Sequence, residues 1–166
     1  MPLKINKANS KGFSLIELTV SLFILITISS IAFMYLYPAA QKRKARDVKR
    51  VADLRSLSRA IEEYRINTGS YPDADNTTRT SNALPTGNSG PYESVTQGWI
   101  DVSFSSYIQK IPVDPKNTGA YVYTYRKNGS NYELNAVLES TAISMTSDGG
   151  NNSSKYETGT SLTLMN

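Results

Sequence analysis

The chain has 166 residues, a formal net charge of +4, and neither cysteine nor histidine. These absences exclude disulfide bonds and remove the side chain that most often serves as a general base or metal ligand. The sequence also contains no phosphate-binding loop, dinucleotide fingerprint or nucleophile–base pair, so we do not expect an enzyme.

The positive charge is local. Residues 1–12 carry three lysines, and residues 42–65 carry nine basic against four acidic side chains, whereas residues 66–166 carry six basic against nine acidic. Because the excess is confined to two short stretches, the overall basicity does not point to a nucleic-acid partner.

Residues 1–12 show no apolar periodicity and are predicted to form a short basic leader peptide. An ordinary secretory signal peptide is one alternative, but the apolar run that follows exceeds the usual length of about 7–15 residues and ends in no small-residue cleavage site. An uncleaved N-terminal anchor is another. Neither alternative explains the acidic residue inside the apolar run.

Residues 13–37 form an apolar run of 25 residues with a single charge, Glu17. As a helix rising about 1.5 Å per residue, the run would reach roughly 37 Å, enough to cross a bilayer core of about 30 Å. A carboxylate inside such a segment is costly, which predicts a functional role for Glu17.

The start of this run resembles a known processing signal. Lys11-Gly12-Phe13-Ser14-Leu15-Ile16-Glu17-Leu18, followed by Val20, is similar to the prepilin signature of type IV pilins and type II secretion pseudopilins. The resemblance implies cleavage between Gly12 and Phe13 by a prepilin peptidase, and N-methylation of Phe13. It also implies that Glu17 pairs with the N-terminal amine of a neighbouring Phe13 during filament assembly.

Membrane orientation raises a conflict. Six basic residues lie between Lys42 and Arg50, against three before the span, and this count alone would place the C-terminal side in the cytoplasm. The prepilin resemblance implies the reverse, with the head outside the cytoplasm. We follow the signature because its residues and spacing are more specific than a charge count.

The residues after the span predict a second helical stretch, residues 39–67, followed by the stop signals Gly69 and Pro72. Pro38 removes a backbone donor and is predicted to kink the helix near the outer interface. The helix is expected to carry one apolar stripe with spacings of three and four. This stripe consists of Val48, Val51, Leu54, Leu57 or Ser58, Ile61 and Tyr64.

The rest of the chain is expected to form a long loop over residues 68–98 and a sheet over residues 99–166. Within the sheet region, alternating residues on both sides of Asn128-Gly129 predict a β-hairpin. Residues 100–104 and 161–164 are weaker strand candidates, and a helical turn over 107–111 is the alternative to the first. The succession of Ile111-Pro112-Val113-Asp114-Pro115, the hairpin and Leu138-Glu139 is similar to that in the heads of major pseudopilins and closely related pilins.

We therefore expect an α+β fold of the pilin type. The predicted parts are a leader over residues 1–12, a transmembrane and assembly helix over 13–37, and a globular head over 38–166. The long N-terminal helix, made of a transmembrane half and an amphipathic half, would pack its second half on a small antiparallel sheet.

One segment of the head resembles the calcium-binding loop of major pseudopilins. In Asp148-Gly149-Gly150-Asn151-Asn152 only Asp148 is acidic, with Glu157 further on, whereas Ca²⁺ takes about six to eight oxygen ligands. A simple turn is the preferred interpretation, and structural calcium is the alternative. No other metal or cofactor is expected.

The resemblance implies a structural function, that of a major-pilin-like subunit in a type IV pilus, a homo-oligomeric filament. Before assembly the subunit would lie in the inner or cytoplasmic membrane, and afterwards in an extracellular filament. The alternatives are a pseudopilin of a type II secretion system and a single-pass, membrane-anchored binding module that never polymerises. Adhesion, motility and DNA uptake remain equally open.

Overall fold

The computed structural model describes residues 12–36, 38–141, 145 and 148–165. The predicted leader, except Gly12, lies outside these residues. The chain divides into two compact units, Met1–Ala39 and Ala40–Asn166.

Helix α1, Leu15–Leu36, makes up most of the first unit. Every side chain described between Gly12 and Phe33 is exposed. The stretch Leu15–Phe33 has a mean hydropathy of 2.2 over 19 residues, so its length and composition suit a membrane span. Its hydroxyl groups return hydrogen bonds to the helix's own carbonyls, as Thr19 and Ser21 do at 2.9 and 2.6 Å. This satisfies their polarity without water.

Helix α2, Pro38–Thr68, lies in the second unit from its third residue onward. Proline suits the first turn of a helix, where its missing N–H has no partner to lose. The helix ends at Gly69, whose backbone φ is +83° and whose N–H donates to the Arg65 carbonyl at 2.8 Å. The predicted kink at Pro38 depends on Tyr37, which lies outside the described residues, so it stays a prediction.

The predicted apolar stripe of α2 is buried over most of its length. Val51, Leu54, Leu57 and Ile61 are buried, and Tyr64 packs against the core. Val48 is the exception: its side chain is 55% exposed, so this part of the stripe was predicted wrongly. At this end of the helix the buried positions belong to ionic side chains instead.

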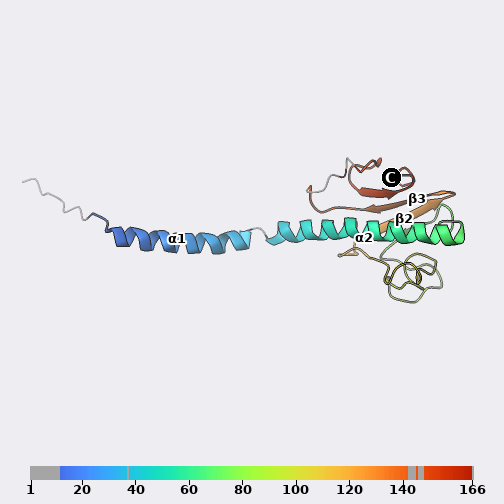
Figure 1. Cartoon of the computed structure of the whole chain (residues 1–166), viewed down its shortest axis with the longest axis horizontal. Coiled ribbons are helices and arrows are strands. Elements are labelled where there is room, and N and C mark those ends of the chain that lie inside the picture. Colours follow the sequence, from blue (N-terminus) through green and yellow to red (C-terminus); the bar gives the residue numbers. More distant parts are fainter. Residues whose placement is uncertain (1–11, 37, 142–144, 146–147, 166) are drawn as a thin grey trace, which may run out of the picture. The chain divides into compact units, whose positions relative to one another are not determined.

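Four antiparallel strands form one sheet in the order β1-β2-β3-β4 (Figure 1). The predicted hairpin is present, because Asn128 pairs with Asn131 and leaves Gly129 and Ser130 as a two-residue turn. Gly129 has a φ of +57°, which suits glycine at the first central position of such a turn. The strands are Thr78–Thr80, Tyr123–Asn128, Asn131–Ala136 and Tyr156–Gly159.

The other strands differ from the sequence prediction. Strand β1 lies inside the stretch predicted as a loop, and the last strand is β4 rather than residues 161–164. The backbone amides of Leu164 and Met165 instead donate to the Glu133 carboxylate, at 2.6 and 2.9 Å. Residues 100–104 form no strand either, and a single turn follows Phe104.

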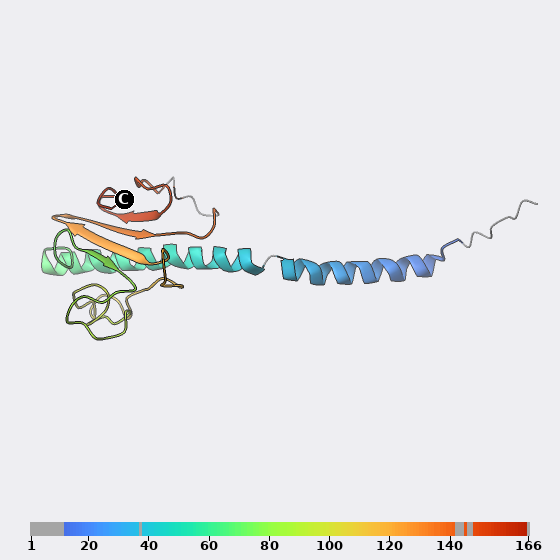
Figure 2. The ribbon, with the colours of Figure 1, turned by 180° about the vertical axis from the view of Figure 1, so that it is seen from behind.

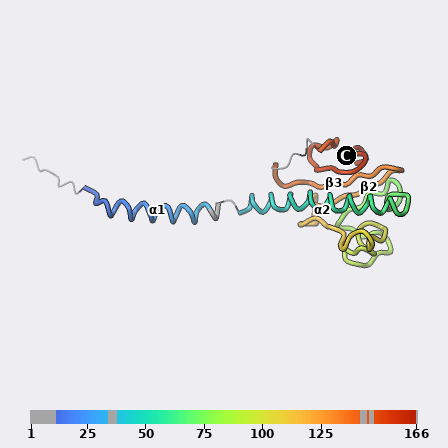
Figure 3. The backbone as a smooth tube through the Cα atoms, viewed as in Figure 1, coloured from blue at the N-terminus to red at the C-terminus, as the bar shows by residue number. Residues whose placement is uncertain are grey.

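The core lies between α2, the sheet and the long connecting segment, residues 81–122, which joins β1 to β2 (Figures 1 and 2). Two tyrosines of the sheet reach α2 directly: the Tyr132 hydroxyl lies 2.8 Å from Ser58 Oγ, and the Tyr123 hydroxyl donates to Asp53 at 2.8 Å. The connecting segment winds beside α2, as the tube in Figure 3 shows. It supplies four buried apolar side chains, Trp99, Ile100, Phe104 and Ile111.

A buried ionic cluster joins α2 to two distant parts of the chain. The Arg50 side chain is fully buried and donates two hydrogen bonds to Asp114, at 2.6 and 3.0 Å. It also donates to Asp47 and to Glu139, both at 2.8 Å. Arg46 and Lys116 complete the cluster by binding Glu139, at 2.6 and 2.9 Å. The cluster thus contains three cations and three carboxylates, and its formal charges cancel.

We predict that α2 contributes to the core chiefly through its buried apolar face. A chain beginning at Gln41 should be soluble and should melt cooperatively. Ile61→Ala should lower its free energy of unfolding by about 2–5 kcal/mol, because Ile61 is fully buried. Thermal unfolding can be followed by the fluorescence of Trp99, the only tryptophan.

Val48→Ala is the matched control, because Val48 lies on the same helix but is exposed. Its effect should stay within about 0.5 kcal/mol. Equal effects of the two substitutions, or a wild-type chain without a thermal transition, would contradict the described core.

We also predict acid sensitivity from the ionic cluster. The hydrogen bond from Arg46, followed by those from Lys116 and Arg50, holds the pKa of Glu139 well below its ordinary value of 4.5, although burial opposes this. A lowered carboxyl pKa stabilises the fold above the unfolded-state pKa, and this contribution is lost as pH falls through the folded-state pKa. Urea midpoints should therefore decrease progressively below about pH 4.5.

Glu139→Gln should lower the urea midpoint at pH 7 and weaken its dependence on acid. Glu63→Gln, on an exposed carboxylate of α2, should change neither. The interpretation fails if the Glu139 variant loses stability on acidification as steeply as the wild type.

Candidate processing and assembly site

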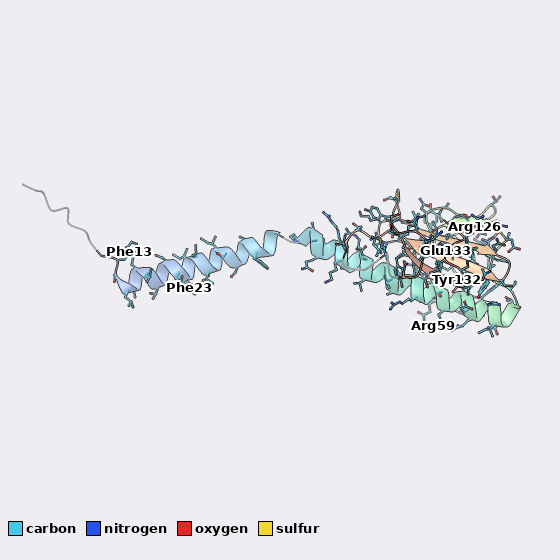
Figure 4. All side chains as sticks on the ribbon, turned by 90° about the horizontal axis from the view of Figure 1, so that it is seen from above. Phe13, Phe23, Arg59, Arg126, Tyr132 and Glu133 are labelled. Atoms are coloured by element: carbon cyan, nitrogen blue, oxygen red, sulfur yellow. The ribbon has the colours of Figure 1, made fainter. Side chains whose placement is uncertain are left out.

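The predicted cleavage site lies just before helix α1. Gly12, Phe13 and Ser14 are not helical, and the Leu18 amide donates to the Ser14 carbonyl at 3.0 Å, which makes Ser14 the N-cap. The Phe13 side chain is 75% exposed, and Figure 4 shows it at the start of α1. The peptide bond between Gly12 and Phe13 therefore lies in a non-helical, exposed segment.

Gly12 is not required by the fold of its own chain. A Cβ atom added at Gly12 would meet no other atom within 4 Å, and the backbone does not adopt the left-handed conformation that favours glycine. A requirement for glycine at this position would therefore arise from a partner that reads the segment.

Glu17 lies in the first turn of α1 and is exposed. Leu15–Phe33 contains no lysine or arginine, and no described side chain forms an ion pair with this carboxylate. The N-terminal end of a helix favours a negative charge, but in apolar surroundings the carboxylate still needs a cationic partner. The described residues of the chain do not supply one.

The C-terminal loop around Asp148 is closed by its own backbone amides. Asp148 accepts hydrogen bonds from the amides of Gly150 and Glu157, at 3.0 and 2.8 Å. Glu157 accepts one from the Asn152 amide at 3.0 Å. A Cβ atom at Gly150 would lie only 1.7 Å from Glu157 Oε2, so the loop packs directly on this carboxylate.

Comparison with protein-family models gives two matches. Residues 38–155 match the model described as "Type II secretion system (T2SS), protein G", which covers most of the chain. The chain belongs to the type II secretion system protein G family. Residues 7–33 match the prokaryotic N-terminal methylation motif. No similar protein was found among curated proteins or among solved structures.

Together these matches make the protein G family member a type IV pilin-like protein or a secretion pseudopilin. They confirm the resemblance drawn from the N-terminal signature, and the helix-on-sheet architecture confirms the predicted α+β fold. The apolar α1 and the methylation motif identify the protein as a membrane-anchored subunit. Families of this kind assemble into filaments with pilus or secretion machinery.

The described residues do not fit a calcium ion. Both oxygens of Asp148 already accept backbone amides, and among the described residues no group of three or more acidic side chains could hold a metal. Burial, and then the neighbouring Glu133 carboxyl, raises the pKa of Glu157, although the Asn152 amide opposes this.

The sequence interpretation did not predict that Glu133 and Glu157 are buried, and it named Glu157 only as a possible calcium ligand. Each retains one oxygen, Oε1, without a hydrogen-bond donor. In a strand whose apolar residues alternate with polar ones, glutamates at the polar positions are expected to face water. Here residues 160–165 follow β4, and two of their amides bind Glu133, so a later part of the chain covers this face. Only the alternation of Tyr132, Leu134 and Ala136 hinted that Glu133 faces the other side of β3.

We predict that Gly12→Val blocks removal of the leader, because a β-branched side chain should not enter a peptidase site that admits glycine. N-terminal sequencing or intact mass should show wild-type protein beginning at Phe13, with an added methyl group. The variant should retain Met1.

The head of the Gly12→Val variant should melt at the wild-type temperature, because a Cβ at residue 12 contacts none of the described residues. Recovery of a mature N-terminus at Phe13 from the valine variant would show that glycine is not read at this position.

Proposed function

We propose that this protein is a structural subunit that is cut between Gly12 and Phe13 and then polymerises through α1 into a helical filament. The observation that carries the proposal is α1 itself, an apolar helix with every described side chain exposed and a single unpaired carboxylate. The role is architectural rather than catalytic. A prepilin peptidase and an assembly machinery are the required partners.

The physical basis of assembly is the transfer of α1 from lipid to protein. Apolar side chains gain little hydrophobic energy on this transfer, because lipid tails are as apolar as the neighbouring helices. Polar interactions therefore weigh heavily. Cleavage before Phe13 creates an amine that stays basic after methylation and can pair with Glu17 of a neighbouring subunit. Pairing removes two isolated charges from a water-poor interior, where either alone would be costly.

We place the head outside the cytoplasm because the prepilin signature implies this orientation, first on the membrane precursor and later on the filament. The ion pairs of Arg46, Lys49 and Arg50 do not alter the charge count, because the rule counts lysine and arginine and carboxylates contribute little to it. The signature is preferred to the count because its residues and spacing are more specific.

Two filaments are candidates. The match of residues 38–155 to protein G favours a short secretion pseudopilus. The surface type IV pilus expected from the sequence is the second candidate. It is favoured by the C-terminal loop, whose carboxylates are occupied by its own amides where major pseudopilins are expected to hold calcium.

We predict that Glu17→Ala sharply lowers incorporation into filaments while sparing membrane insertion and leader removal. The substitution removes a charge from an apolar span and leaves the cleavage site unchanged. The measurement is the ratio of sheared-filament to cell-associated protein. Glu63→Ala is the matched control, since Glu63 is an exposed carboxylate on α2 without an ion-pair partner among the described residues, and its ratio should not change. Normal recovery of the Glu17 variant in the sheared fraction would remove the main chemical support for polymerisation.

The same strains, with a deletion strain, separate the two filaments. Loss of secreted proteins from the medium without loss of long surface filaments identifies a pseudopilus. Loss of long filaments containing this protein, with normal secretion, identifies a pilus. If wild-type cells carry no filament containing this protein and the deletion strain secretes normally, the result would point to the non-polymerising membrane-anchored module.

A further inference from the structure

Three consecutive cations, Lys42, Arg43 and Lys44, lie near the start of α2. All three are exposed, and none forms an ion pair with a described residue. Successive residues of a helix point about 100° apart, so the three charges cover a broad part of the helix surface rather than one face. They form what we call the basic collar.

The collar differs from the cations that follow it on the same helix. Arg46 binds Glu139 at 2.6 Å, Lys49 binds Asp53 at 2.8 Å, and Arg50 is buried with Asp114. The folded head thus neutralises the next three basic residues and leaves the collar without counter-charge.

A second copy of the chain offers few free carboxylates to the collar. Residues 66–166 contain nine acidic side chains, and each already accepts a hydrogen bond or forms an ion pair within its own chain. On the described part of α2, only Glu63 lacks such a partner. Anions that match three clustered cations must therefore come mainly from another kind of molecule.

Chain connectivity keeps the collar close to the membrane. Helix α1 ends at Leu36 and α2 begins at Pro38, so the collar lies four to six residues into α2, about 6–9 Å along its axis. The polar headgroup region extends roughly 5–8 Å beyond each side of the hydrocarbon core. Charge interactions at physiological salt persist over about 8 Å, so lipid phosphates lie within reach.

We propose that Lys42, Arg43 and Lys44 bind the headgroups of anionic phospholipids in the leaflet that contains the C-terminal end of α1. This rests on the membrane anchor and does not require polymerisation. A headgroup phosphate supplies the counter-charge that the head does not, and several lipids can be shared among three flexible side chains. The collar would thereby retain the subunit at the membrane surface until it is taken into a filament.

The experiment uses the full chain reconstituted in phosphatidylcholine vesicles with a trace of spin-labelled lipid. Electron paramagnetic resonance gives the fraction of labelled lipid held at the protein surface. Labelled phosphatidylglycerol should associate at least about fivefold more strongly than labelled phosphatidylcholine, the effect of a single basic residue near an anionic surface. The preference should fall as salt is raised to about 1 M, where charge interactions reach only about 3 Å. Lys4, Lys7 and Lys11 are replaced by glutamine in all samples, so that only one end of the span is measured.

Lys42→Gln/Arg43→Gln/Lys44→Gln should abolish the preference, and Arg43→Gln/Lys44→Gln should remove most of it. The matched control is Arg55→Gln/Arg59→Gln, which removes two exposed cations of the same helix at least eleven residues further from the span. Figure 4 shows Arg59 on the side of α2 away from Tyr132 and Glu133 of the sheet. This control should keep the full preference, and all variants should melt like the wild type because the substituted residues are exposed.

The proposal is overturned if the wild type shows no preference for phosphatidylglycerol, or if the Arg55/Arg59 control loses as much preference as the collar variants. If the wild type shows no lipid preference and the collar variant yields fewer sheared filaments, the collar would be assigned to contacts between subunits. Glu17→Ala keeps the two proposals separate: it should reduce filaments and leave the lipid preference intact.

Discussion

The head depends on a single buried cation. Arg50 lies on the face of α2 that would otherwise be apolar, and its guanidinium group has no access to water. A buried charge that loses its partner costs roughly 3–5 kcal/mol, so Arg50 can be accommodated only when its carboxylates are in place. These come from α2 itself, from Asp114 in the connecting segment and from Glu139 after β3. The ionic cluster therefore couples the position of the helix to that of the loop and of the hairpin.

This constraint divides the chain's apolar surface into two kinds. The apolar stripe of α2 packs against tyrosines of the sheet and against the connecting segment, and the ionic cluster lies at the N-terminal end of the stripe. By contrast, none of the described side chains of α1 is buried. The apolar surface of α2 is buried when the head folds, whereas the apolar surface of α1 stays exposed for contacts with lipid or other helices. Assembly through α1, as proposed, would need this separation, because a head that used α1 for its core could not release it to lipid or to neighbouring helices.

The sequence predicted features that depend on local pattern and missed those that depend on distant contacts. The hairpin at Gly129 follows from alternation and turn chemistry, and the stripe of α2 follows from helical spacing. The local pattern did not predict the burial of Arg50, because two of its carboxylate partners are 64 and 89 residues away. Strands β1 and β4 are short, and they pair with β2 and β3, which lie far from them in the sequence. At the candidate site, the sequence motif was sufficient to predict Gly12, Phe13 and Glu17. The open surroundings of Gly12 and the hydrogen bonds that close the loop at Asp148 could be seen only in the three-dimensional structure.

The two proposals assign the behaviour of the subunit to the charges at the two ends of the span. Within α1 the exchange of lipid for protein contacts is nearly balanced, because both surroundings are apolar. The unbalanced terms are polar: Glu17 at one end, without a cation in its own helix, and the basic collar beyond the other end, without carboxylates in its own head. If both proposals hold, the collar pairs with lipid phosphates in the membrane while Glu17 has no partner. In the filament Glu17 would gain an amine and the collar would leave the headgroups. Assembly would then exchange one ionic interaction for another, and its direction would depend on which of the two is stronger.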